Sequence, residues 1–89
     1  MTMTKNNKDV FQTADLSLAV ALCVSGFVVE EMSRVSPTRS MFVFEDSAEL
    51  HATVGGYWRG ELRVEPQTFF NQMKILKARI YEICSPNRR

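Results

Sequence analysis

The sequence lacks a long hydrophobic run, and this excludes a membrane-spanning helix as its main feature. The longest apolar run, Leu18 to Val24, is far shorter than the roughly 20 residues needed to cross a bilayer. The opening segment, MTMTKNNKD, is polar and has no apolar stretch of the kind found in secretory signal peptides. The sequence therefore predicts a soluble protein of the cytoplasm.

The chain also lacks a strong excess of either charge. Its formal net charge is +1, so no overall field demands a nucleic-acid partner. The distribution is less even, because residues 1–58 carry a net charge of −3 and residues 59–89 carry +4. If any part binds an anion, the C-terminal third is the expected one, although a basic last turn also suits a helix dipole.

Metal-binding and cofactor-binding patterns are missing. Cys23 and Cys84 share no CxxC spacing and are expected to be free thiols, although a disulfide joining their two helices remains open. One histidine and two scattered cysteines cannot build a structural zinc site. The pair Gly55–Gly56 lacks the lysine and flanking pattern of a phosphate-binding loop. We therefore expect no metal and no cofactor.

A catalytic set is not recognisable either. The only histidine, His51, lies near Glu45, Asp46 and Glu49, any of which could pair with it in a general-base site. No nucleophile stands at a recognisable spacing, and the three carboxylates do not match a calcium loop. We therefore expect His51 to be an exposed helix histidine and the protein not to be an enzyme.

The first half of the chain predicts a strand, a helix and a hairpin. A strand begins at Val10–Phe11, and the segment LSLAVALCVSG is apolar nearly all round, which is typical of a helix buried on several sides. Thr13 is the expected N-cap and Gly26 the left-handed residue at the C-terminal end.

Two further strands are expected at residues 27–32 and 41–45, joined by a polar loop of about five to eight residues. The unbroken apolar run MFVFE predicts that residues 41–45 form the central strand and are buried on both faces.

The second half of the chain predicts two helices. Asp46 and Glu49 have the spacing of a capping box, with Leu50 and Val54 on one face of the helix that follows. Gly55–Gly56 should weaken this helix by about 1 kcal/mol per glycine, or end it early. Pro66 opens the last helix, which runs to about Cys84.

These elements define one domain of the α+β class. The order β-α-β-β-α-α predicts a small, mainly antiparallel three-stranded sheet with three helices. The domain spans residues 10–84, with a disordered N-terminus at 1–9 and a disordered tail at 85–89.

The last helix carries two neighbouring stripes. Its core stripe, which recurs every three or four residues, comprises Phe69, Met73, Leu76, Ile80 and Ile83. The second, which we call the aromatic–lysine stripe, comprises Phe70, Lys74, Lys77 and Tyr81. It borders the core stripe, so the edge of Phe70 is expected to pack against the core while lysine stems lie along the aromatics. A helix with two such stripes often packs against two partners, and the second can be another copy of the same chain.

A second candidate surface is the segment YWRGELRVE. Tyr57 and Trp58 bring large apolar area, and Arg59 and Arg63 flank them. Aromatics beside arginines can anchor a protein interface or stack on bases. Trp58, the only tryptophan, is expected to fill the core, whereas Tyr57 is open to either role.

Several motifs together resemble a known family. They are Phe11-x-Thr13-x-Asp15-Leu16, Phe44-Glu45-Asp46, Tyr57-Trp58, Val64-x-Pro66-x-x-Phe69 and Leu76-Lys77-x-Arg79-Ile80-Tyr81. With them the chain, over roughly residues 10–82, is similar to a family of small bacterial and phage proteins that is known only as a domain of unknown function. The resemblance implies a bacterial or phage (mobile-element) setting and no activity.

The sequence leaves two functions open. The first is a non-catalytic interaction or adaptor module, expected to be a homodimer or to bind a protein through Tyr57, Arg59 and Arg63 and through the aromatic–lysine stripe. The alternative is a nucleic-acid-binding accessory protein. Its candidate contacts are Lys74, Lys77, Arg79, Tyr81, Arg88 and Arg89.

Overall fold

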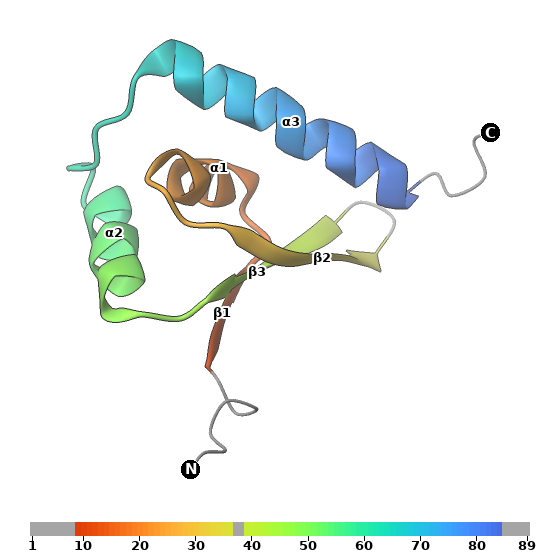
Figure 1. Cartoon of the computed structure of the whole chain (residues 1–89), viewed down its shortest axis with the longest axis horizontal. Helices are drawn as coiled ribbons and strands as arrows, with labels where there is room; N and C mark the ends of the chain where they lie inside the picture. The colour runs from red at the N-terminus through yellow and green to blue at the C-terminus, as the bar shows by residue number, and fades with distance from the viewer. Residues whose placement is uncertain (1–8, 37–38, 85–89) are drawn as a thin grey trace.

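The computed structural model describes residues 9–36 and 39–84, and its elements follow the expected order. They are β1 (Val10–Thr13), α1 (Leu16–Val24), β2 (Val29–Ser36), β3 (Arg39–Glu45), α2 (Ala48–Trp58) and α3 (Pro66–Cys84). The α3 helix lies across α1, and α2 stands beside α1 (Figure 1). The α+β prediction, with three strands and three helices, is confirmed.

The sheet has the order β1-β3-β2, and both pairings are antiparallel. Phe44 of β3 is opposite Phe11 of β1 and Val29 of β2, so apolar residues from all three strands meet on one face. The prediction that residues 41–45 belong to the central strand is confirmed, because β3 is hydrogen-bonded on both sides.

Burial of β3 on both faces was a wrong prediction. Phe42 and Phe44 are buried, but Met41 and Val43, which point the other way, are only half-buried. The neighbours of Val43 across the sheet, in β1 and β2, are exposed polar residues. An apolar run thus does not by itself establish two-sided burial, since neighbouring strands can partly cover a residue without a second layer.

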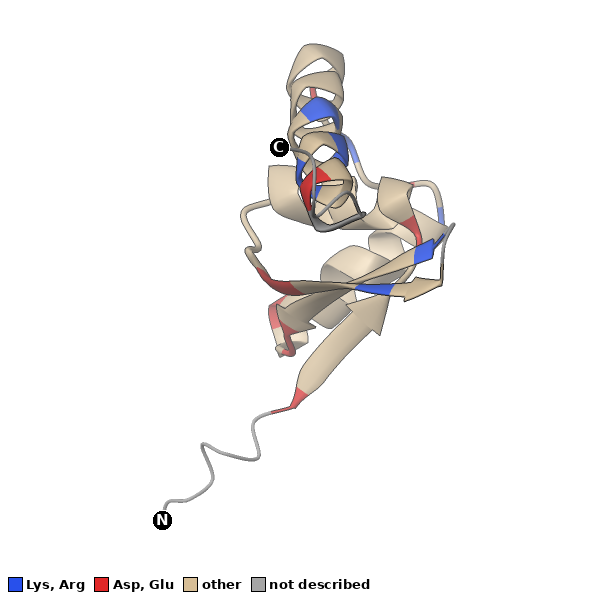
Figure 2. Cartoon of the chain, turned by 90° about the vertical axis from the view of Figure 1, so that its right-hand side faces the viewer, with Lys and Arg blue, Asp and Glu red and all other residues tan. Residues whose placement is uncertain are grey.

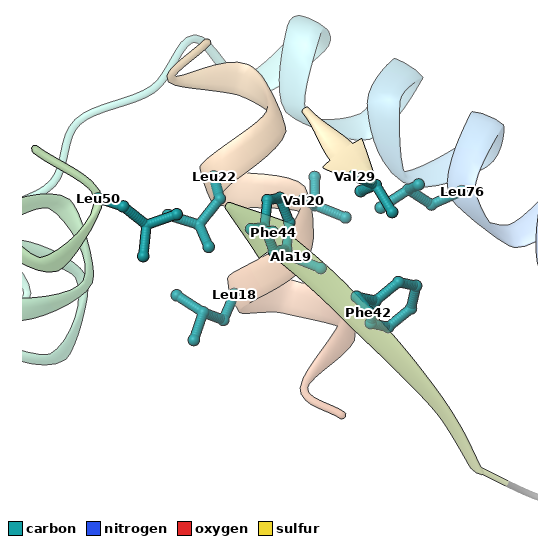
Figure 3. Packing of buried hydrophobic residues seen from close by; sticks show 9 residues of the cluster. All are labelled: Leu18, Ala19, Val20, Leu22, Val29, Phe42, Phe44, Leu50 and Leu76. Atoms are coloured by element: carbon teal, nitrogen blue, oxygen red, sulfur yellow. The ribbon is translucent and has the colours of Figure 1, made fainter. Parts of the chain in front are cut away.

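The core gathers around α1, as its apolar sequence predicts. Nine buried residues make up the cluster: Leu18, Ala19, Val20, Leu22, Val29, Phe42, Phe44, Leu50 and Leu76. Leu50 of α2 and Leu76 of α3 lie on opposite sides of this cluster (Figure 3). Burying a side chain of this size contributes about 1.5–3 kcal/mol, so the two helices are held mainly through these residues and their half-buried neighbours.

The ends of α1 have well-defined caps, of which one differs from expectation. Asp15, not Thr13, is the N-cap, and its Oδ1 accepts a hydrogen bond from Leu18 N at 3.2 Å. Thr13 still belongs to β1, paired with Phe42, so the chain is extended until Asp15. At the other end Gly26 has φ +107°, and the amide of Phe27 donates to the Leu22 carbonyl, which closes the helix as predicted.

The start of α2 also lies one residue later than expected. Ser47 is the N-cap, and its Oγ accepts from Leu50 N at 3.1 Å, so Asp46 and Glu49 do not form the predicted capping box. Asp46 instead lies beside the start of β1, because its backbone amide donates a hydrogen bond to the Asp9 carbonyl. The helix runs through both of its glycines to Trp58, with Arg59 as its C-cap, and Gly60 after the cap has φ +74°.

The hairpin strands are longer than the sequence indicates. β2 continues to Ser36 and β3 begins at Arg39, so the expected loop of five to eight residues is wrong. Pairs such as Ser33 with Met41 and Arg34 with Ser40 extend the ladder through polar sequence. Backbone pairing here outweighs side-chain preference, as is common in sheets.

Some predictions lie outside the described residues. They include the disorder expected for residues 1–8 and 85–89, and the candidate contacts Arg88 and Arg89. The backbone of α3 is described to its end, whereas the side chains of Ile83 and Cys84 are not.

Candidate functional site

The α3 helix begins at a local hydrogen-bonded turn. The Glu65 Oε1 accepts from the backbone N of Thr68 at 2.7 Å and from the Thr68 hydroxyl at 2.8 Å. Hydrogen bonds from the Thr68 backbone, then its hydroxyl, then the Gln67 backbone lower the pKa of Glu65, while slight desolvation acts the other way. Together with Pro66 at the first helical position, this turn sets where α3 begins.

The core stripe of α3 behaves as predicted within the described side chains. Leu76 is fully buried, and Phe69, Met73 and Ile80 pack against the core cluster. This face fixes the rotation of α3 about its own axis. It therefore also decides which residues the helix presents to solvent.

The aromatic–lysine stripe lies in solvent. Phe70 is 62% exposed and Tyr81 is 72% exposed, and both lysines between them are exposed. The expectation that the edge of Phe70 packs into the core is wrong, although its ring still meets that of Phe69 edge-on at 6.3 Å. The four residues share one face because their spacing of four, three and four follows the helical repeat.

Trp58 is the largest departure from expectation in this region. It is 64% exposed, whereas Tyr57 packs against the core and meets the Trp58 ring edge-on at 5.0 Å. The core is filled from α2 by Leu50, Val54 and Tyr57, which follow the helical repeat, and Trp58 is the next residue round the helix. The prediction that Trp58 fills the core is therefore wrong.

The two arginines of this segment are both exposed. Arg59 turns back, and its Nε lies 3.0 Å from Glu61 Oε1. Its guanidinium lies over Gly55, where the Cβ of any other residue would come within 3.1 Å of the guanidinium. Gly55 therefore gives Arg59 room to fold onto the helix. Such an exposed ion pair contributes little to stability.

The first turn of α1 lies between the two candidate segments. On one side, burial raises the pKa of Tyr57, the Asp15 carboxylate raises it further, and a hydrogen bond with the Ser17 side chain lowers it. On the other side, Leu16 lines a hollow of about 270 Å³ together with Lys77, Ile80 and Tyr81 of α3. The structure therefore brings the end of α2 and the Lys77 and Tyr81 part of the aromatic–lysine stripe to the same end of α1.

Arg79 lies on a different side of α3 from the lysines. At 100° per residue it is about 160° around the helix from Lys77. Its charge acts on Cys23 at the far end of α1, where burial raises the pKa of the thiol and Arg79 partly opposes that rise. Thus α1 passes beneath α3. Its first residue, Leu16, lies at the aromatic–lysine stripe, and Cys23, near its other end, lies near Arg79. The basic residues do not form one continuous surface.

His51 is paired with one of the three carboxylates considered for it. Its Nε2 lies 2.6 Å from Asp46 Oδ1, and its ring meets that of Phe11 edge-on at 6.2 Å. The Oδ1 is buried yet makes no well-aligned hydrogen bond, so the pair is a close contact only. The imidazole side chain is 60% exposed, and the pair lies at the junction between β3 and α2.

The described residues include a second hollow but no cluster of metal ligands. No group of three or more histidine, cysteine, aspartate or glutamate side chains there could hold a metal ion. A second hollow, of about 350 Å³, lies where β2 begins, with Glu30 and Glu45 in its lining. In the part of the chain that the structure describes, no helix is long and apolar enough to span a bilayer.

The fold and this surface define a small α+β domain with exposed aromatics on its last helix. The chain belongs to the family described as Domain of unknown function (DUF5659), whose model matches residues 8–82. The suspected resemblance to a domain of unknown function is thereby confirmed. No curated protein and no solved structure matches the chain.

Proposed function

We propose that the protein is a non-catalytic interaction module that docks a protein partner through the aromatic–lysine stripe of α3 and the adjoining end of α2. The observation that carries the proposal is the exposure of Phe70, Tyr81 and Trp58 on a domain this small. Large exposed aromatics are enriched at the anchoring positions of protein interfaces. A bacterial or phage setting and a cytoplasmic location belong to the same proposal.

The arrangement supports docking because the exposed aromatics lie on well-anchored helices. Phe70 and Tyr81 follow directly after Phe69 and Ile80, which pack on the core. A partner would therefore meet side chains whose helix is already held in place, and less conformational freedom is lost on binding.

Site-specific photo-cross-linking tests this function. A photoreactive phenylalanine analogue replaces Tyr81 or Phe70, and the full chain is irradiated in an extract of its source cells. Discrete products are expected at both positions. The matched control is the same analogue at Val35, which is also exposed but lies in β2. Identical products at all three positions, or products at Val35 alone, would contradict docking through α3.

A homodimer through the same stripe is a second form of this proposal. Around a two-fold axis, antiparallel copies of α3 would place Phe70 opposite Tyr81 and Lys74 opposite Lys77, because the spacing is symmetric. The aromatics favour this pairing, but two ammonium groups 4 Å apart repel by about 1 kcal/mol in water. Sedimentation at high micromolar concentration distinguishes the two forms. The self-association of a dimer should become tighter with added salt, because salt screens the repulsion between the lysine ammonium groups.

Nucleic-acid binding is the alternative function, and Lys74, Lys77 and Tyr81 on one face favour it. Arg79 lies on another side of the helix. Two phosphate contacts predict a log–log salt slope of only about −1.4 for a single strand, at about −0.7 per contact. Absence of binding to an oligonucleotide library at low salt would exclude this alternative.

A further inference from the structure

The hollow beside α1 is suited to an apolar side chain. It measures about 270 Å³ and is lined by Leu16, Lys77, Ile80 and Tyr81. An apolar cavity of about 150 Å³ already holds a benzene ring. One large aliphatic or aromatic side chain of a partner therefore fits the hollow.

The charges around this hollow favour an acidic partner. Lys74 and Lys77 are one turn apart and exposed, and no described carboxylate forms an ion pair with either. Most acidic residues of the domain lie around the sheet and the start of α2, whereas α3 carries Lys74, Lys77 and Arg79 and a single acidic residue, Glu82 (Figure 2). Both lysines are thus available for charge pairing with another molecule.

We infer that the aromatic–lysine stripe binds an acidic amphipathic helix of another protein. This inference rests on the proposed function and names the chemistry of the partner. One apolar side chain enters the hollow, the others pack on Phe70 and Tyr81, and carboxylates pair with Lys74 and Lys77. Phe70 and Tyr81 are about 16 Å apart along the helix axis at 1.5 Å per residue. Three turns of a partner helix span that distance.

Other occupants fit the same face less well. A second copy would bring four lysine amines together, as the symmetric spacing requires. A nucleic-acid strand would find only two exposed cations in line on this face. An acidic helix matches both the apolar and the basic part of this surface.

Titration of the ¹⁵N-labelled full chain with synthetic peptides tests the inference. The probe is an amphipathic peptide of about four turns, with leucines on one face at the helical repeat and glutamates flanking them. Two matched peptides carry glutamine or lysine in place of every glutamate. Of the three peptides, the glutamate peptide should shift the amide signals of Leu16, Phe70 and Tyr81 at the lowest peptide concentration. Added salt should weaken its binding.

Charge reversal on the protein provides the matched control. Lys77→Glu should weaken the glutamate peptide about tenfold or more, since an attraction becomes a repulsion. Arg39→Glu, an equal change of charge at an exposed position in β3, should weaken the peptide less than Lys77→Glu, because Arg39 belongs neither to the aromatic–lysine stripe nor to the lining of the hollow.

Each contrary outcome has a separate meaning. If the glutamine or lysine peptide binds this face as tightly, the acidic partner is wrong while docking through α3 stands. If oligothymidylate binds the face more tightly than the glutamate peptide, the inference is overturned in favour of nucleic acid. If no peptide shifts this face and Tyr81 also gives no specific cross-link, both the inference and the proposed function fail.

Discussion

The helices α1 and α3 use their apolar residues in opposite ways. α1 spans Leu16–Val24, and an unbroken block from Leu18 to Leu22 is buried. α3 has 19 residues, yet among those whose side chains are described only Leu76 is buried. A short helix such as α1 is marginal alone and is stabilised by its surroundings. The longer helix has length to spare, so part of its apolar surface remains available to other molecules.

Truncation of the core should show the largest difference between the two helices. Leu22→Ala removes a fully buried side chain from α1 and should lower the free energy of unfolding by about 2–5 kcal/mol. Ile75→Ala, at an exposed position on α3, should change it by less than about 0.5 kcal/mol. Urea denaturation followed by circular dichroism measures both. Equal losses would contradict the division of roles between α1 and α3.

Glycine substitutions should sharpen the comparison between helix ends and helix interiors. Gly26→Ala, at φ +107° after α1, should cost about 1–3 kcal/mol because L-residues rarely adopt this conformation. Gly56→Ala, inside α2 with open space around its Cα, should instead stabilise the protein by about 0.4–1 kcal/mol. Thermal denaturation of both variants is the measurement, and shifts of the same sign would refute the assigned cap.

The start of α3 should depend on pH through Glu65. The lowered pKa of Glu65 means that its contribution to stability is present above its ordinary value of 4.5. This contribution is lost as the pH falls through the lower, folded-state pKa. Wild type and Glu65→Gln should therefore differ most in stability near neutral pH and converge in acid. A difference that stays constant down to pH 3 would show that the Thr68 hydrogen bonds do not stabilise the ionised form.

The smallest effect is expected on the aromatic–lysine stripe itself. Phe70→Ser and Tyr81→Ser should each change stability by less than about 1 kcal/mol, because both rings are mostly in solvent. Each variant should abolish specific cross-linking from the photoreactive analogue placed at the other of the two positions. If either serine variant lowered the free energy of unfolding in urea as much as Leu76→Ala does, the rings would be part of the core. The main support for docking would then be removed.

Periodic patterns in the sequence predict the elements well and the surface poorly. The core stripe of α3 follows from a repeat of three or four residues, and Gly26 follows from its place after an apolar run. Trp58 was expected to fill the core and the edge of Phe70 to pack against it. Which aromatic of a neighbouring pair is buried depends on the rotation of its helix. The repeat from Leu50 and Val54 favours Tyr57 over Trp58, whereas the size of a side chain gives no such signal.

The helix starts show a similar limit. Thr13 and Asp15 can both cap α1, and Asp46 and Ser47 can both cap α2, because each has a side-chain oxygen of suitable reach. The choice is made by β1 and β3, whose pairing keeps Thr13 and Asp46 out of the helices. The hairpin length is likewise decided by pairing partners and not by the polar residues between the strands.

The sequence by itself determines the α+β class, the order of the elements and the central place of residues 41–45. Hydrophobic periodicity and turn chemistry act locally, so they can be read along the chain. Tertiary structure alone decides that Leu16 and Tyr81 share one hollow, that the charge of Arg79 acts on Cys23 and that Tyr57 packs on the core while Trp58 is in solvent. These relations join segments far apart in sequence, and they arise only when the helices pack around α1.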